Sequence, residues 1–223
     1  MDTPSSPEVL PSLVPLTRGL AALFWGLPLS LVVGVHTATA GMISHFGSLP
    51  PVATTALLAF GAFQIGHFQA QERVWQQALD RVKLVALVNV GLAPFLHWSR
   101  LLPHELHFRV AVGVLAVCAL LFLFNLNLAL QRLAAMLPDE TLRQETRLFT
   151  RVNQGLILTT LVSVTAVIAA RNLHLLSVPM TQAIGRFGLP LLLLLVLLPV
   201  ALTMAMLWKT KETVLASAFA PRS

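Results

Sequence analysis

Charged side chains are scarce in this chain. Of its 223 residues, 11% are Asp, Glu, Lys or Arg, whereas 56% are of hydrophobic types. A soluble globular domain usually carries about 25% charged residues. A chain this apolar would expose too much hydrophobic surface in water, so the composition excludes a soluble single domain. It predicts a protein embedded in a lipid bilayer.

Cysteine is also nearly absent, since Cys118 is the only one in the sequence. A single cysteine excludes a disulfide bond within the chain and a thiolate metal cluster. Cys118 stands inside an apolar run, and we expect it to pack as a small hydrophobic residue.

Motifs of several enzyme and pump classes are missing. The sequence contains no glycine-rich phosphate loop and no GxSxG nucleophile elbow. All nine acidic residues lie outside the predicted hydrocarbon zone. Proton and cation pumps usually keep a carboxylate at mid-membrane, because a charge there is costly and is retained for function. These absences favour a non-enzymatic protein that is not a pump of this kind.

What the chain does have is six long apolar runs. A bilayer core of about 30 Å needs roughly 20 apolar residues in a helix, and backbone polar groups cannot stay unpaired in lipid. We therefore predict an all-α polytopic membrane protein, a bundle of about six transmembrane helices in a single domain over residues 18–208. A polar tail (1–17) precedes it and a cytoplasmic tail (209–223) follows. The predicted spans are 18–36, 51–67, 84–98, 108–130, 155–170 and 189–208.

Basic residues are unevenly divided between the segments that join these runs. With the N-terminus inside, the inner segments hold 11 of the 15 Lys and Arg residues and the outer segments hold 4. This positive-inside bias predicts both termini in the cytoplasm and a multi-pass protein of the cell's plasma or inner membrane. Trp98 and Trp208 fall at predicted membrane edges, where aromatic residues are enriched. The basic residues are thus explained by orientation and lipid headgroups, and no motif points to nucleic acid.

The first run has an alternative interpretation as a signal peptide, because Ala38-Thr39-Ala40 resembles a signal-peptidase site. However, the 17 residues before the run contain Asp2 and Glu8 and no basic residue. The run is also longer than the roughly 7–15 residues of a signal h-region. We expect an uncleaved first span.

Two inner loops are predicted to be helical. In residues 68–83, Trp75, Leu79 and Val82 recur at helical spacing. This pattern predicts a helix that lies at the membrane surface or prolongs the second span. Proline at a first helical position with acids behind it is typical of a helix start, so from Pro138 a helix of 33 residues is predicted to run to Ala170.

The first span carries a stripe of small residues at fourth-residue spacing. Such a stripe lets helix backbones approach closely. It indicates either packing against another span of the same chain or a seam for self-association or a partner. Pro28 lies in the same helix and should bend it. The stripe consists of Ala22, Gly26, Ser30, Gly34 and Ala38.

Amide side chains gather toward the cytoplasmic ends of four spans. One interpretation is a set of interhelical hydrogen bonds, each stabilising the bundle by about 0.6 kcal/mol. The other is an inward-facing polar cavity that binds a small solute. The two differ in whether these side chains point at one another or at a shared void. The solute-binding candidates are Gln64, Asn89, Asn125, Asn127 and Asn153.

Histidines at the outer ends of the spans are candidate metal ligands. His36 and His97 end neighbouring spans at the same depth and are the pair to test as axial haem ligands. His104 and His107 are three residues apart and share a face if the segment is helical. Spans four and five contain no histidine, so at most one haem b or a metal ion fits. The alternative is that these are interfacial histidines and that the protein has no cofactor.

Arg143, Arg147 and Arg151 recur at fourth-residue spacing on the extended fifth helix. They form either a solvated face or a contact for anionic lipid headgroups or an acidic partner. Arg151 is nearest the membrane, so we assign it to lipid phosphate first.

Three functional hypotheses follow from these patterns. The first is a non-enzymatic membrane protein that binds or passes a small solute through the amide cluster. The second is an accessory or scaffold subunit, in which the small-residue stripe either pairs two copies as a homo-oligomer or docks on a partner of a membrane complex. The third, ranked lowest, is a haem or metal-binding redox protein that uses the outer histidines.

Overall fold

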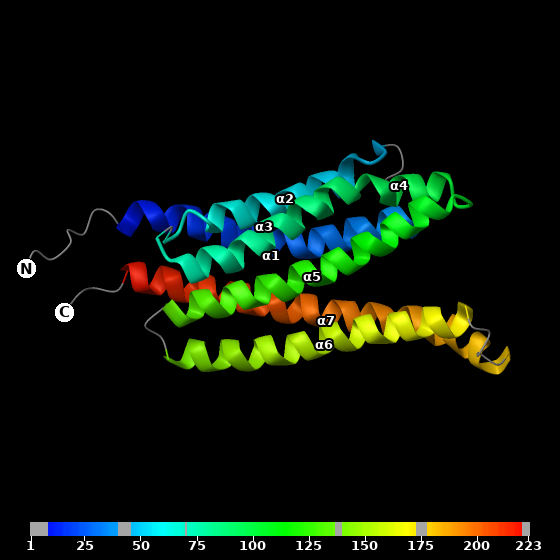
Figure 1. Ribbon diagram of the computed structural model, residues 1–223. Coiled ribbons are helices and arrows are strands. Elements are labelled where there is room, and N and C mark those ends of the chain that lie inside the picture. The colour runs from blue at the N-terminus through cyan, green and yellow to red at the C-terminus, as the bar shows by residue number, and fades with distance from the viewer. Residues whose placement is uncertain (1–8, 40–45, 70, 137–139, 173–177, 220–223) are drawn as a thin grey trace, which may run out of the picture.

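The computed structural model is a bundle of long helices (Figure 1). It describes residues 9–39, 46–69, 71–136, 140–172 and 178–219, and no strand occurs among them. The side chains of Arg171 and Arg186, and all of Arg222, Pro138 and Asp139, lie outside the described part. The helices are α1 (Val9–Thr39), α2 (Leu49–Ile65), α3 (Arg73–Leu92), α4 (Pro94–Leu101), α5 (Leu106–Met136), α6 (Glu140–Asn172) and α7 (Val178–Phe219).

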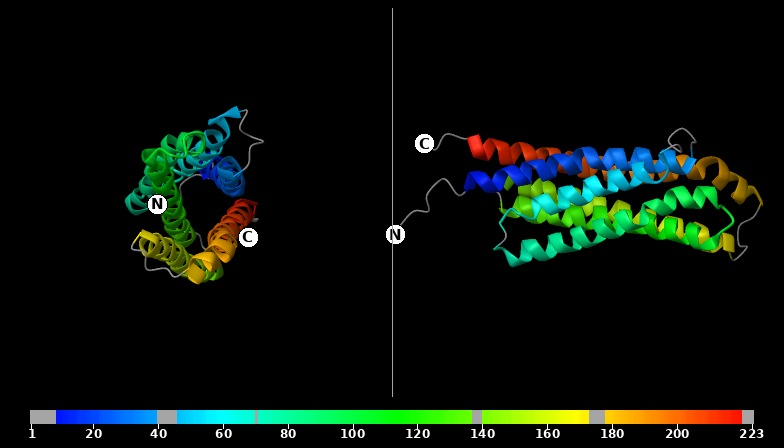
Figure 2. Two further views of the ribbon diagram at one scale, coloured as in Figure 1. Left: turned by 90° about the vertical axis from the view of Figure 1, so that its right-hand side faces the viewer. Right: turned by 90° about the horizontal axis from the view of Figure 1, so that it is seen from above.

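The helices form a closed circuit when the bundle is seen from its end (Figure 2). Going round it, α1 packs on α2, α2 on α3, α3 on α5, α5 on α6, α6 on α7, and α7 back on α1. The start of α1 and the end of α7 lie at the same end of the bundle, together with the end of α2, the start of α3, the end of α5 and the start of α6 (Figure 1). We call this the terminal end. Sequence neighbours are therefore spatial neighbours, as short connections between antiparallel helices require.

All six predicted apolar runs fall on helices, which confirms the helical class. Three helical segments are long and apolar enough to cross a membrane, namely Leu13–Ala38, Leu106–Met136 and Leu194–Leu215, and Leu49–Ile65 is a shorter apolar helix. The run at 84–98 is divided between α3 and α4. The division falls at Pro94, whose ring nitrogen carries no hydrogen to continue the helix.

The long fifth helix occurs as predicted, since α6 has 33 residues. The 68–83 segment is helical from Arg73 onward, but its predicted placement is wrong. It belongs to α3, where it runs unbroken into the third apolar run rather than lying on the surface or extending α2. Its apolar side chains Trp75, Leu79 and Val82 are buried in the bundle, which removes the reason for a surface position. The Trp75 Nε1–H donates to the carbonyl oxygen of Phe68 at 2.9 Å, which holds the α2–α3 turn against α3.

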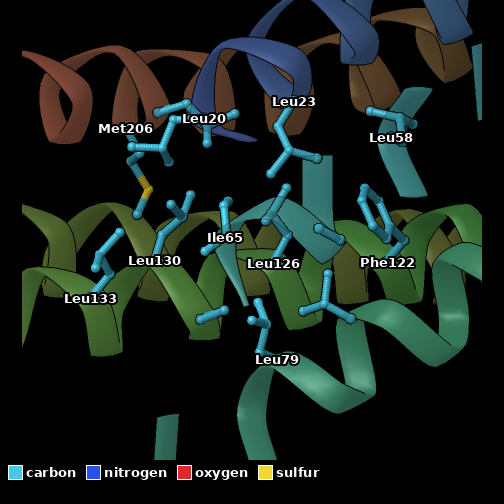
Figure 3. Close-up of a cluster of buried hydrophobic side chains, with 14 of the residues drawn as sticks. Leu20, Leu23, Leu58, Ile65, Leu79, Phe122, Leu126, Leu130, Leu133 and Met206 are labelled. Atoms are coloured by element: carbon cyan, nitrogen blue, oxygen red, sulfur yellow. The ribbon is translucent and has the colours of Figure 1, made fainter. Parts of the chain in front are cut away.

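The apolar core lies between α1, α2, α3, α5 and α7 (Figure 3). Leu20 and Leu23 of α1 meet Ile65 of α2, and the side chains of α5 line the opposite side of the core. Among the residues whose burial is described, α6 contributes a single fully buried apolar side chain, Ile157. The buried side of α6 is otherwise polar, and the candidate site lies there.

Candidate functional site

The buried side of α6 is lined by hydroxyl and amide groups. Thr146, Thr150, Asn153 and Thr160 are all buried, with Ile157 among them. Their spacing of four, three, four and three residues places these five side chains along one side of the helix. On α7, Thr203 and Thr210 are buried in the same way. The two helices thus face one another partly through polar groups.

Three buried polar side chains, one each from α5, α6 and α7, meet at one point. The amide nitrogens of Asn127 on α5 and Asn153 on α6 each donate to the hydroxyl oxygen of Thr203 on α7, at 2.9 Å in both cases. The Thr203 hydroxyl in turn donates to the carbonyl oxygen of Pro199 at 2.8 Å. All three residues are completely buried. We call Asn127, Asn153 and Thr203 the Thr203 cluster.

Every donor in the Thr203 cluster is used. A side-chain amide carries two N–H groups, and the second bond of Asn127 goes to Leu123 O at 2.7 Å. The second bond of Asn153 goes to Pro199 O at 3.2 Å. The acceptors are different, because Asn127 Oδ1 and Asn153 Oδ1 are buried and have no hydrogen-bond partner among the described residues. The cluster therefore presents two uncharged, unpaired carbonyl oxygens in a buried setting.

A second polar contact joins α6 and α7 beside the cluster. Pro199 has no N–H, so the carbonyl of Leu195, four residues earlier, loses its usual partner within the helix. The single hydroxyl hydrogen of Thr160 is shared between that carbonyl oxygen, 3.3 Å away, and Leu156 O of its own helix, 2.8 Å away. In membrane helices, hydroxyl groups of a neighbouring helix commonly satisfy a carbonyl that proline has freed.

The polar side of α6 continues from the cluster toward the terminal end. Thr150 lies one turn before Asn153, and its hydroxyl is buried without a partner among the described residues. The Thr210 hydroxyl on α7 is in the same state. We call Thr146, Thr150, Thr160 and Thr210, with the Thr203 cluster, the polar seam.

A groove of about 370 Å³ opens between α6 and α7 at the terminal end of the seam. Its apolar lining comes from Leu148, Phe149, Ala205 and Met206, and its polar lining from Glu145, Thr146 and Lys209. Glu145 and Lys209 form an ion pair that joins the two helices.

The structure brings together only two of the five predicted solute-binding residues, Asn127 and Asn153. Asn125 donates to Leu121 O of its own helix at 2.7 Å. Asn89 is buried on α3 with its Oδ1 unpaired, and Gln64 is half-buried on α2. Within the described residues, no hydrogen bond joins these three to the Thr203 cluster.

Thr203 was missed by sequence reasoning, although a signal for it exists. It is the only hydroxyl-bearing residue between positions 189 and 208, and an isolated polar residue in an apolar span generally has a partner.

The predicted small-residue stripe on α1 is only partly used for packing. A Cβ atom built on Gly26 would lie 2.8 Å from Leu58 Cδ2 of α2, whereas one on Gly34 would meet nothing within 4 Å. Ala22 and Ser30 are half-buried, and Ala38 is exposed.

The backbones of α1 and α2 also approach closely at Gly19 and Gly61, which the stripe did not include. A Cβ on Gly19 would lie 2.8 Å from the carbonyl oxygen of Gly61 and 2.9 Å from the backbone nitrogen of Ile65. Gly19 precedes Gly26 by two helical turns and so lies on the same side of α1, but the fourth-residue spacing of the stripe continues to Arg18 and therefore did not include it.

The candidate metal ligands lie at the end of the bundle opposite the terminal end. His36 is in the last turn of α1 and His97 is in α4, and both are half-buried. His104 and His107 are exposed, and His107 Nδ1 lies 3.5 Å from Glu105 Oε2. The part of the chain that the structure describes contains no group of three or more His, Cys, Asp or Glu side chains suited to a metal ion. A haem or metal site remains a prediction from the sequence.

The three arginines of α6 differ in their surroundings. Arg143 is half-buried and donates from its Nη2 to Ala135 O at the end of α5, at 3.2 Å. It therefore ties the end of α5 to the start of α6. Arg147 and Arg151 are exposed.

No protein-family model, curated protein or solved structure matches this chain.

Proposed function

We propose that the protein is a six-span integral membrane protein of the plasma or inner membrane, with the terminal end in the cytoplasm. Large apolar side chains such as Trp25, Leu158 and Val162 cover the outside of the bundle and are more than half exposed, at 63%, 61% and 58%. An exterior with many large exposed apolar side chains is unfavourable in water and suits lipid. The terminal end also carries most of the basic residues in the sequence, which favours a cytoplasmic position.

Within this bundle, we propose that the polar seam binds a small uncharged solute and lets it pass. The observation that carries the proposal is the pair of buried, unpaired oxygens, Asn127 Oδ1 and Asn153 Oδ1. A buried acceptor without a partner is unfavourable by about 1–3 kcal/mol. A solute that brings N–H or O–H donors would remove this penalty, and the neutral cluster offers an ion no compensating charge.

The proposed site is thus narrower than the predicted amide set. It consists of Asn127, Asn153 and Thr203, with Thr150 on the side toward the terminal end. Gln64, Asn89 and Asn125 lie outside it. Nothing in this arrangement includes a nucleophile paired with a base, so the proposal is a non-enzymatic one.

The test is solute permeation into vesicles containing the purified protein. Urea, glycerol and ammonia are suitable probes, because each is small, uncharged and able to donate hydrogen bonds. We expect faster entry of at least one probe than into protein-free vesicles. Asn153→Leu and Asn127→Leu should abolish that gain, because leucine has a similar size and no acceptor.

Asn125→Leu is the matched control, since Asn125 is on α5 two residues from Asn127 and bonds only within its own helix. It should leave permeation unchanged. Wild-type vesicles that behave like protein-free ones would remove the proposal, as would full activity of Asn153→Leu with its helix content intact.

A scaffold or accessory role is the second candidate, and the open surface at Gly34 favours it. A Cβ built on Gly34 would meet nothing from the rest of the described structure within 4 Å, so the outer half of the α1 stripe is available for a second copy or another membrane helix. Under this hypothesis Gly34→Leu releases the partner, or dissociates the homo-oligomer, on a sizing column. An unaltered elution position would rule out the α1 stripe as the contact surface. Gly26→Leu is unsuitable as the test, because Leu58 already fills that space.

A further inference from the structure

The groove between α6 and α7 has two chemically different parts. Leu148, Phe149 and Met206 supply an apolar floor, and Lys209 supplies a cation at the rim, where it is paired with Glu145. Leu148 is also 62% exposed and therefore belongs to the outer surface of the bundle as well as to the groove. An apolar chain on the outer surface of α6 can thus reach the groove at Leu148.

The rim carries features of a membrane–water boundary. Trp208 is 52% exposed, and the Lys211 ammonium lies 5.8 Å from the centre of its indole ring. Tryptophan and lysine are typical of this boundary. The Lys209 ammonium has three N–H donors, and its ion pair with Glu145 is made to a single carboxylate oxygen, Oε2. Donors therefore remain for a second anion.

The ends of α6 and α7 carry a net positive charge, to which the exposed Arg147 and Arg151 contribute without lining the groove. Residues 140–151 of α6 and 208–212 of α7 contain five basic residues against three acidic ones. A groove with an apolar floor and a cationic rim matches one kind of molecule, in which a fatty acyl chain is joined to a negatively charged headgroup.

We infer that this groove holds an anionic phospholipid, with one acyl chain on Leu148, Phe149 and Met206 and its phosphate at Lys209. The site is separate from the outward-facing Arg147 and Arg151, and it does not depend on solute passage through the seam. It does rest on the membrane placement proposed above.

The experiment is lipid retention by the intact protein, measured by native mass spectrometry after reconstitution into equimolar phosphatidylglycerol and phosphatidylcholine. The wild type should retain phosphatidylglycerol in preference to phosphatidylcholine. Lys209→Gln should weaken this retention about tenfold, the effect of losing one charge-assisted hydrogen bond. Ala205→Phe should weaken it similarly by filling the floor of the groove.

Two matched variants serve as controls. Ala201→Phe adds the same ring to an exposed position one turn away on α7, and Arg81→Gln removes an exposed basic residue from α3. Both should retain phosphatidylglycerol as the wild type does. Circular dichroism of each variant checks that its helix content is preserved. The lipid preference of the wild type is measured on the unaltered protein, so misfolding of a variant cannot affect it.

Several results would overturn the inference. They are equal retention of both lipids by the wild type, unchanged retention by folded Lys209→Gln and Ala205→Phe, and displacement of the lipid by inorganic phosphate alone. Failure of the membrane placement is distinguishable, because the chain would then be recovered from cells in the aqueous fraction after carbonate extraction.

Discussion

The hydroxyl of Thr160 on α6 donates to the carbonyl oxygen of Leu195 on α7, 3.3 Å away. That carbonyl is the one that Pro199 leaves unpaired, so a side chain of one helix compensates for a proline in its neighbour. The same pair of helices is joined again at Thr203. The α6–α7 contact is therefore specified by hydrogen bonds as well as by shape, and its consequences can be tested residue by residue.

The first prediction concerns the coupling between Thr160 and Pro199. Thr160→Val should destabilise the wild-type bundle, because Leu195 O loses its donor. In a Pro199→Ala background the new backbone N–H can satisfy that carbonyl, so the same substitution should have a smaller effect. We expect a coupling free energy of about 0.5–1.5 kcal/mol from the unfolding of the four proteins in mixed micelles. Strict additivity would show that the Thr160 bond does not compensate for the proline.

The second prediction concerns Thr203 itself. Thr203→Val keeps the shape of the side chain but removes the acceptor of Asn127 and Asn153 and the donor to Pro199 O. Loss of two interhelical bonds and one bond within α7 should lower the free energy of unfolding by about 1–2 kcal/mol. Thr165→Val is the control, because the Thr165 hydroxyl is exposed and bonds only to Leu161 O. Equal effects of the two substitutions would contradict a special role for the cluster.

The third prediction concerns the crossing of α1 and α2. Gly19→Ala would place a methyl group 2.8 Å from Gly61 O and 2.9 Å from Ile65 N. Backbone atoms cannot move aside like a flexible side chain, so the helices must separate. We expect a loss of about 1–3 kcal/mol in the free energy of unfolding. Gly34→Ala, at an open position of the same helix, should change it by less than about 0.5 kcal/mol.

The fourth prediction concerns the turn between α2 and α3. Trp75→Phe removes the bond from the indole N–H to Phe68 O, which is 2.9 Å long. The substitution should lower the unfolding free energy by about 1 kcal/mol and make residues 66–72 more sensitive to limited proteolysis. Trp98→Phe is the comparison, since Trp98 is exposed on α4. Cleavage of the turn at the wild-type rate would show that the bond does not hold it.

The sequence identified the amide-rich ends of the spans but could not select among them. Asn125 and Asn127 are two residues apart on α5, which places them on nearly opposite sides of a helix. Asn127 turns toward α6 and α7, whereas Asn125 bonds to its own helix. Which of the two faces a neighbour depends on the rotation of α5 about its axis, and the packing of the whole bundle sets that rotation.

Composition and helical period alone determined the all-helical class, the positions of the apolar runs and the full length of α6. These are local properties, because backbone hydrogen bonds within a segment and its own apolar residues are sufficient to specify them. The tertiary structure decided that the 73–83 segment continues into the third span, that Gly19 rather than Gly34 meets α2, and that Thr203 joins three helices. Each of these depends on which side of a helix is covered by residues distant in the sequence. A small or polar residue is the same in the sequence whether its partner is another helix, lipid or a second copy of the chain. Only the packed structure distinguishes these three kinds of partner.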